Sequence, residues 1–218
     1  MARQLSFDWP TGVALGPDDF FVAEPNAQAF AMLEAPESWP DRKLVITGPD
    51  GCGKSHLARI FQNRTGGDLL DASALQDTMP RASTIIVEDM ETLPAASEEA
   101  MFHLHNHLHN TDGTLLMTAA TPPSRWPIAL PDLASRMQAT TIAQISNPDD
   151  ALLQALIMKL FADRQISPQP DLARYLATRI ERSYAAAADI VQRLDEQALA
   201  RGRKLNKRLA AELLDNPS

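Results

Sequence analysis

The chain has 218 residues, 44% of them hydrophobic and 22% charged, with a formal net charge of −8 and a mean hydropathy of −0.22. These values exclude a disordered or low-complexity chain, and the acidic balance argues against strong non-specific DNA binding, which needs a surplus of Lys and Arg. No apolar run reaches the roughly 20 residues of a membrane-spanning helix, and the N-terminus lacks the apolar core of a signal peptide. One cysteine cannot form a disulfide framework, which agrees with a reducing compartment. Together these features lead us to expect a cytoplasmic protein with no membrane partner.

The first 150 residues predict strands that alternate with helices. Short apolar runs with β-branched residues predict strands over 43–47, 84–87, 114–118 and 140–143. A shorter strand is predicted over 68–71, after the Gly66-Gly67 turn. Apolar residues at helical spacing predict a helix from Lys54 to Arg64, and another that opens at Ser97 and ends before Gly113. This alternation predicts an α/β fold with a parallel sheet covered by helices.

From Asp149 onward the apolar residues repeat only at helical spacing. Thirteen of the 16 prolines precede residue 149, and none lies between Asp171 and Asn216. Residues 1–150 hold 9 Lys and Arg against 20 Asp and Glu, whereas residues 151–218 hold 11 against 8. We therefore expect a domain boundary near Asn147–Asp149, followed by a smaller helical part.

The P-loop pattern G-x-x-x-x-G-K-[ST] is matched by Gly48-Pro49-Asp50-Gly51-Cys52-Gly53-Lys54-Ser55. The match follows a predicted strand and opens an amphipathic helix, as the motif requires. Glycines let backbone N–H groups turn towards phosphates, and the helix N-terminus adds its positive dipole end. We expect this loop and the following His56 to bind a nucleotide, with Lys54 on the β- and γ-phosphates and the Ser55 hydroxyl on Mg²⁺.

Cys52 lies inside this loop. A thiol near a helix N-terminus could be acidified and reactive. We prefer the simpler interpretation of a small residue at an unconstrained loop position.

Two acidic residues, Glu88 and Asp89, directly follow the predicted strand over 84–87. In open α/β sheets ligands bind at the carboxyl ends of the strands, and carboxylates there can hold Mg²⁺ and orient water. Because a P-loop lies one strand-helix unit upstream, we expect both residues to contribute to the Mg²⁺ site of the bound nucleotide.

Four histidines alternate within one predicted helix: His103, His105, His107 and His109. Pairs spaced by four residues could each supply two metal ligands. Neither pair carries the glutamate of an H-E-x-x-H motif and no third ligand is evident, so a solvated helix face is the preferred interpretation and metal binding stays an alternative.

A basic run extends from Arg201 to Arg208 and includes Arg203, Lys204 and Lys207. Such a run could contact nucleic acid. Too few residues follow it for a helix-turn-helix reader, so we interpret it as a polar face around the last short helix.

Several motifs resemble, in order, the ATPase region of DnaA-type bacterial replication initiators, which are AAA+ proteins. They are the P-loop, EDME after the third predicted strand, MFHLHNHL, TAATPP after the fourth strand, and LPDLASR. Upstream, DDFFVAEPNAQA resembles the segment that covers the adenine in that family, which implies nucleotide contacts from Phe21, Val22 and Asn26. The resemblance extends from about Asp18 to Leu214. It implies an AAA+ αβα nucleotide-binding domain over 18–147 and a small helical lid domain over 148–218.

The N-terminal Gln4-Leu5-Ser6-Phe7 resembles the Q-L-x-L-type peptide of DnaA-homologous regulatory inactivators, the Hda group. That peptide docks in an apolar groove of the DNA polymerase sliding clamp, the β subunit. The resemblance implies that residues 1–17 bind the clamp, with Gln4 as the polar anchor and Leu5 and Phe7 in the pocket. It also implies the DnaA initiator as a partner, DNA contact only through these partners, and nucleotide-dependent self-association.

The chain departs from the initiator pattern where the family reads the nucleotide. Glu88 replaces the usual Mg²⁺-binding aspartate, Ala120 occupies the polar sensor position after the fourth strand, and Ala185 falls where the lid usually offers an arginine. Losing groups that read the γ-phosphate argues against hydrolysis by this chain. Arg136, in contrast, matches the arginine finger, which acts in trans on a neighbouring subunit's nucleotide.

The resemblance thus implies an adaptor that binds ADP or ATP, docks on the clamp and stimulates ATP hydrolysis by the DnaA initiator, which negatively regulates replication initiation. Two alternatives stay open. One is an autonomous P-loop ATPase of helicase-loader type, and the other is a non-hydrolysing scaffold with a vestigial nucleotide site.

Overall fold

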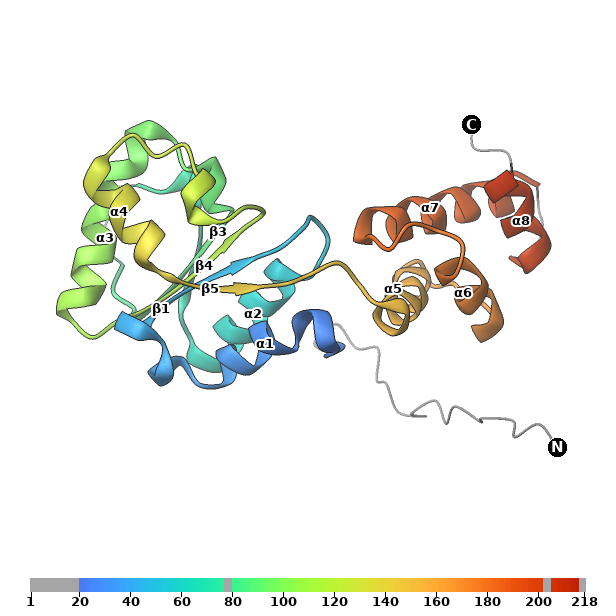
Figure 1. Ribbon diagram of the computed structural model, residues 1–218, viewed down its shortest axis with the longest axis horizontal. Helices are drawn as coiled ribbons and strands as arrows, with labels where there is room; N and C mark the ends of the chain where they lie inside the picture. Colours follow the sequence, from blue (N-terminus) through green and yellow to red (C-terminus); the bar gives the residue numbers. More distant parts are fainter. Residues whose placement is uncertain (1–19, 77–79, 202–204, 216–218) are drawn as a thin grey trace.

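The computed structural model describes residues 20–76, 80–201 and 205–215 (Figure 1). The segment over residues 1–17, with Gln4, Leu5 and Phe7, lies outside this part of the chain, so its binding to the sliding clamp stays a prediction. Arg203 and Lys204 of the basic run also lie outside it.

Within the described residues, five parallel strands form one sheet. The strands are β1 (Lys43–Thr47), β2 (Asp68–Asp71), β3 (Thr84–Glu88), β4 (Thr114–Ala119) and β5 (Thr141–Gln144). They lie in the order β2-β3-β4-β1-β5, and every neighbouring pair is parallel. The predicted parallel α/β sheet is confirmed, and each strand begins and ends within one residue of its predicted range.

Helices cover both faces of the sheet, because successive side chains of a strand point to opposite faces. The helices are α1 (Glu24–Glu34), α2 (Lys54–Thr65), α3 (Glu98–Asn110) and α4 (Pro131–Ala139). Leu44 and Ile46 of β1 pack in one core with α1 and α2, whereas Val45 packs in a second core with α3 and α4. Figure 1 shows the two pairs of helices on opposite sides of the strands. Arg136 of α4 and the P-loop helix α2 therefore lie on opposite faces.

The start of α3 is tied to the start of α4 by a buried carboxylate. Glu98 is 4% exposed, and its two carboxylate oxygens accept the backbone N–H groups of Ala129 and Leu130, at 2.9 and 2.6 Å. Ser97 precedes α3 as predicted, but its hydroxyl donates to the Leu75 carbonyl at 2.8 Å and does not cap the helix. Glu98 thus helps to fix α4, the helix that carries Arg136.

The remaining helices form a smaller part with its own hydrophobic core. They are α5 (Asp150–Asp163), α6 (Pro170–Ala177), α7 (Tyr184–Arg201) and α8 (Lys207–Asp215). The Asp149 carboxylate caps α5 by accepting the Leu152 N–H at 2.7 Å, which places the first helix of this part just after the predicted boundary.

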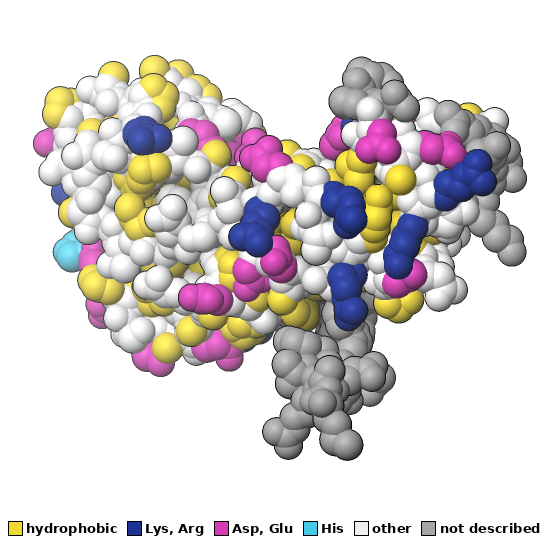
Figure 2. Space-filling view, turned by 45° about the vertical axis from the view of Figure 1, so that its right-hand side comes forward, with side chains coloured by type: hydrophobic (Ala, Val, Ile, Leu, Met, Phe, Trp, Pro, Cys, Tyr) yellow, Lys and Arg dark blue, Asp and Glu magenta, His cyan; other side chains and the backbone are white. Residues whose placement is uncertain are grey.

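Ion pairs form on the charged surface of this helical part. Figure 2 shows several Lys and Arg side chains gathered over it. Lys207 pairs with Asp171 of α6 at 2.8 Å, and Arg208 pairs with Glu212 at 3.3 Å. These pairs favour the polar-face interpretation for the described end of the basic run. No helix in the described ranges is long and apolar enough to cross a membrane.

Candidate nucleotide-binding site

The P-loop connects β1 to α2 and needs glycine for two different reasons. Gly53 has a φ of +98°, which side chains of L-residues rarely adopt, and it directly precedes the helix. Gly48 approaches the backbone so closely that a Cβ there would lie 2.9 Å from the Ile145 carbonyl oxygen. The loop is therefore folded tightly against Ile145, the residue after β5, and it ends at the N-terminus of α2, where a phosphate can bind.

The P-loop lysine is buried beneath its own loop. Lys54 is 8% exposed, and its Nζ donates to the carbonyl oxygens of Gly48 at 2.8 Å and Pro49 at 3.2 Å. The carboxylate of Asp50 lies 3.8 Å away and is itself almost fully exposed. The ammonium group thus sits at the phosphate-binding loop, hydrogen-bonded to two neutral carbonyls and paired with one exposed carboxylate. An anionic phosphate can replace the carbonyls at a gain in charge-assisted hydrogen bonding.

Cys52 is buried, so the prediction of an unconstrained loop position is wrong. It is 4% exposed and packs in the core between the sheet and the helices α1 and α2. Its Sγ lies 2.8 Å from the point that a Cβ on Gly48 would occupy. Burial raises the pKa of the Cys52 thiol, which also argues against the reactive-thiolate alternative.

The two acidic residues predicted to hold Mg²⁺ follow the carboxyl end of β3. The Glu88 Oε1 atom is buried and has no hydrogen-bond partner among the described residues. Asp89 adopts a φ of +56°, and burial, followed by the nearby Glu91 and Glu88, raises its pKa, while Lys54 acts in the opposite direction. An orphaned carboxylate oxygen and a second carboxylate close to the P-loop lysine fit a divalent cation. With the exposed Ser55 hydroxyl on α2, they would hold a nucleotide's Mg²⁺ and so shield its phosphate charge.

A third carboxylate, which the sequence analysis did not single out, reaches the sensor position. Glu91 lies in the 3₁₀ turn Met90–Thr92, and its Oε1 accepts the backbone N–H of Ala120 at 2.7 Å. The preceding residue, Ala119, accepts the Gly48 N–H at 3.3 Å. Hydrogen bonds therefore connect the P-loop to the end of β4, and the sensor position after β4 to the turn that follows β3. In the sequence, Glu91 appears only as the last residue of the EDME motif, two residues after Asp89.

On the other side of the loop, aromatic side chains from the N-terminal segment approach α2. The Phe20 ring comes within 2.9 Å of the point that a Cβ on Gly53 would occupy, stacks on Phe30, and meets His56 edge-on with ring centroids 5.7 Å apart. Phe20 was missed by the sequence analysis, which named its neighbour Phe21.

Of the predicted adenine-covering residues, Phe21 and Val22 lie in a short loop before α1, and Asn26 lies in the first turn of α1. The Asn26 amide Nδ2 donates to the Phe21 carbonyl at 2.9 Å, and its Oδ1 accepts the Ala23 N–H at 2.8 Å. The buried Asn26 thus shapes the loop that carries Phe21 and the half-exposed Val22. Contact of Phe21, Val22 and Asn26 with a nucleotide stays a prediction.

The first residue of α7 brings the helical part onto the P-loop. Tyr184 is 5% exposed, its Cβ lies 3.5 Å from the point that a Cβ on Gly51 would occupy, and its hydroxyl donates to the Ser146 carbonyl at 3.3 Å. Burial raises the pKa of Tyr184, which keeps it a neutral donor. Just before it, Arg182 forms a bidentate ion pair with Asp150 at 2.8 and 3.0 Å, and Ala185 follows. The turn expected to offer an arginine to the nucleotide therefore places a tyrosine against the loop.

Arg136 lies in the last turn of α4. Its guanidinium carbon stands 5.0 Å from the centroid of the Phe102 ring on α3. In the part of the chain that the structure describes, no carboxylate forms a salt bridge with it. A half-buried arginine stacked on one aromatic ring can turn towards a partner at modest cost.

The histidine run is only partly a solvated face, which corrects that interpretation. His105 is 5% exposed and its Nδ1 has no partner among the described residues, whereas His109 is exposed and its Nδ1 lies 2.6 Å from the Asp41 Oδ1. The described ranges contain no group of three or more His, Cys, Asp or Glu side chains that could hold a metal ion. Burial, with the nearby Lys43 and Arg136, lowers the pKa of His105 to about 4.

The pKa of His105 predicts a specific loss of stability in acid. Because the folded state holds this histidine neutral, its contribution to the free energy of unfolding is complete above pH 6.5 and is lost as the pH falls towards about 4. Urea unfolding at pH 7 and pH 4.5 measures the fall in the free energy of unfolding over this interval. For His105→Leu this fall should be about 2–3 kcal/mol smaller than for the parent protein. The free energy of unfolding of His103→Leu, at an exposed position of the same helix, should fall as much as that of the parent. An equal fall for His105→Leu would contradict the conclusion that the folded state holds His105 neutral.

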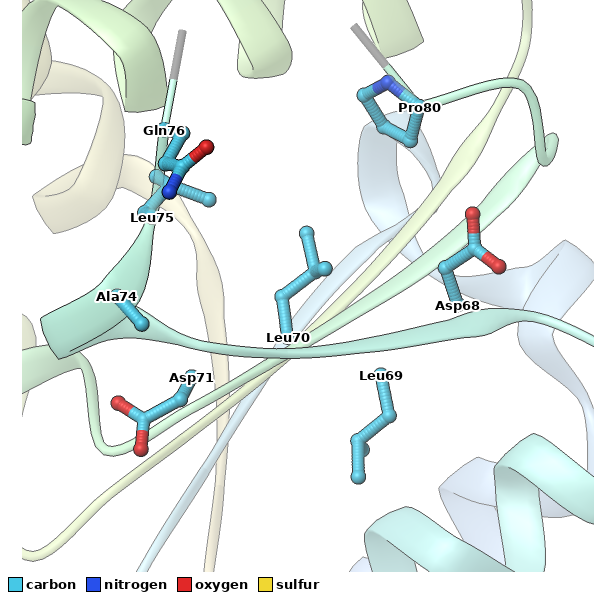
Figure 3. A pocket seen from close by; sticks show the side chains of 8 residues that line it. All are labelled: Asp68, Leu69, Leu70, Asp71, Ala74, Leu75, Gln76 and Pro80. Atoms are coloured by element: carbon cyan, nitrogen blue, oxygen red, sulfur yellow. The ribbon is translucent and has the colours of Figure 1, made fainter. Parts of the chain in front are cut away.

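A separate hollow lies along β2, at the edge of the sheet (Figure 3). It has a volume of about 440 Å³, and Leu70 points into it from the strand on the side where Gln76 and Pro80 lie. Since β3 and β4 separate β2 from β1, this hollow is distinct from the P-loop region.

Comparison with known proteins agrees with this geometry. No family model matches the chain. The chromosomal replication initiator protein DnaA of Cutibacterium acnes is 26% identical over 75% of this chain, and the match spans only 38% of that initiator.

Among solved structures, domain III of the Thermotoga maritima initiator DnaA is similar with a TM-score of 0.75 and 17% identity, covering 95% of this chain and 98% of that one. AMPPCP-bound DnaA from Aquifex aeolicus has a TM-score of 0.67 and 16% identity, covering 83% of this chain and 65% of that one. The RuvB Holliday junction branch migration motor of Thermotoga maritima has a TM-score of 0.61 and 17% identity, covering 89% and 70%. The predicted fold is therefore confirmed: the chain has the AAA+ fold of DnaA domain III, with a helical C-terminal part.

Proposed function

We propose that this chain is a nucleotide-binding AAA+ adaptor that docks on the DNA polymerase sliding clamp and stimulates ATP hydrolysis by the DnaA initiator, and so negatively regulates replication initiation. The observation that carries the proposal is the position of Arg136. It lies on the sheet face opposite its own P-loop helix, stacked on Phe102 and without an ion-pair partner in the described residues. This position supports a role as an arginine finger, which can be supplied in trans to a neighbouring subunit's nucleotide.

The proposal separates two nucleotide sites. This chain's own P-loop, with Lys54 and the acids after β3, holds ADP or ATP with Mg²⁺, as the AMPPCP-bound DnaA neighbour supports. With alanine at positions 120 and 185, little is left to stabilise charge that develops on a γ-phosphate, so this nucleotide is held and not turned over. The hydrolysed ATP belongs to the initiator.

The test is reconstitution with purified clamp and ATP-loaded initiator. The full chain should accelerate phosphate release by the initiator, and it should do so only when both the clamp and the intact Gln4-Leu5-Ser6-Phe7 segment are present. Rapid ATP turnover by the chain alone would favour the autonomous ATPase. Absence of any nucleotide binding would favour the scaffold.

Clamp binding should depend on the N-terminal residues alone. Gln4→Ala or Leu5→Ala in the full chain should abolish binding to immobilised clamp and leave the affinity for ADP unchanged, since the P-loop is intact. A peptide of residues 1–12 should bind weakly, because an extended segment loses conformational entropy on docking. Undiminished clamp binding by a chain that starts at Asp18 would refute the assignment.

A further inference from the structure

We propose that Glu91 is a specificity-determining residue of the nucleotide site, and that its carboxylate selects a nucleoside diphosphate over the triphosphate. The inference rests on the proposed nucleotide binding and adds the residue that sets the preference. It starts from the contact between the Glu91 Oε1 and the backbone N–H of Ala120.

That contact places a negative charge at the end of the phosphate site. β4 lies between β3 and β1, so the residue after β4 lies between the acids of β3 and the P-loop. Ala119 accepts the Gly48 N–H, and the next N–H, that of Ala120, is taken by Glu91. Where a polar side chain could donate to a third phosphate, this chain therefore presents an acceptor.

The surrounding charges leave the carboxylate of Glu91 uncompensated. Its Oε2 atom is buried and has no hydrogen-bond partner in the described ranges. Lys54 is held at the loop carbonyls of Gly48 and Pro49. A cation on Glu88 and Asp89 would offset those two carboxylates, whereas Glu91, turned to the backbone of Ala120, keeps its charge. A further phosphate brought to this end meets like charge in a partly buried place, where screening by water is weak.

The substitution Glu91→Gln separates the charge from the hydrogen bond. The amide oxygen of glutamine can still accept the Ala120 N–H, so the loop keeps its shape, while the charge is removed. Isothermal titration calorimetry of the full chain with Mg²⁺, using ADP and AMPPCP, should show affinity for AMPPCP about tenfold higher than in the parent and affinity for ADP unchanged. Glu91→Ala removes the hydrogen bond as well, and should add a lower melting temperature to the same change in preference.

Glu99→Gln is the matched control, since it removes one negative charge at an exposed position of α3. It should leave both affinities and their ratio as they are in the parent. The inference would be overturned if Glu91→Gln left the ratio of AMPPCP to ADP affinity unchanged. It would also be overturned if the variant bound AMPPCP more weakly, as expected for a residue that serves the Mg²⁺. In both cases binding of ADP would leave the proposed function standing. A parent protein that binds neither nucleotide would overturn both.

Discussion

Replacing Arg136 with alanine is expected to reduce stimulation of the initiator's ATP hydrolysis by about 10³-fold, and to leave folding, nucleotide binding and clamp binding intact. The guanidinium makes one described contact, over the Phe102 ring, so its removal should cost no more than about 1 kcal/mol of stability. In the proposed function, the guanidinium offsets the charge that develops on the γ-phosphate of a nucleotide bound to a neighbouring subunit. Phosphate release from ATP-loaded initiator, measured with and without the variant, gives the size of the effect.

The matched control is Arg125→Ala, which removes an exposed arginine from the 3₁₀ turn Pro123–Arg125 just before α4. It changes the net charge equally and should leave stimulation unchanged. Arg136→Lys should restore little, because an ammonium group cannot reproduce the planar fork of the guanidinium. If Arg136→Ala stimulates the initiator as well as the parent does, the action in trans proposed for Arg136 is wrong.

The sheet could be predicted almost residue by residue because all its strands except β2 are short apolar runs with β-branched residues. Such runs bury both faces, as all five residues of β1 do. The order of the strands and the pairing of helices with faces depend on tertiary contacts, and the sequence alone did not supply them. The helical part was equally visible, since prolines are absent from most of it and its apolar residues keep one period.

The site was predictable only where chemistry follows a local pattern. The P-loop, Glu88 and Asp89 are set by motif and by their place after a strand. Glu91 gains its meaning from a contact with Ala120, 29 residues away, and Tyr184 from contact with a loop more than a hundred residues earlier. No local pattern reports such contacts.

His105 is a different kind of miss, because the information was in the sequence. It lies four residues after Met101 and beside Leu104, on the stripe that α3 buries against the sheet. The alternating histidines suggested one solvated face, but a period of two residues does not describe a helix. The helical period separates the buried His105 from the exposed His103 and His109.

Replacing Lys54 with alanine is expected to weaken ADP and AMPPCP alike, by roughly a hundredfold. In the parent, ADP should bind at least as tightly as AMPPCP, because nothing at positions 120 and 185 rewards a third phosphate. Lys54 lies beneath the loop, hydrogen-bonded to the Gly48 and Pro49 carbonyls, and we expect it to reach the β-phosphate, which both nucleotides carry. Its loss removes a point charge from the site, so both affinities should fall.

Calorimetry on the full chain measures both affinities, and the shift in melting temperature with each nucleotide provides a second readout. Arg59→Ala, an exposed position on the same helix, removes one positive charge without touching the loop and should bind both nucleotides as the parent does. Lys54→Ala leaves the Gly48 and Pro49 carbonyls without their donor, so its melting temperature without nucleotide must be compared with the parent's to show that the loop still folds. If the parent bound AMPPCP a hundredfold more tightly than ADP, groups other than those at positions 120 and 185 would contact the γ-phosphate. The proposal that this chain holds its nucleotide while the initiator hydrolyses ATP would then be wrong.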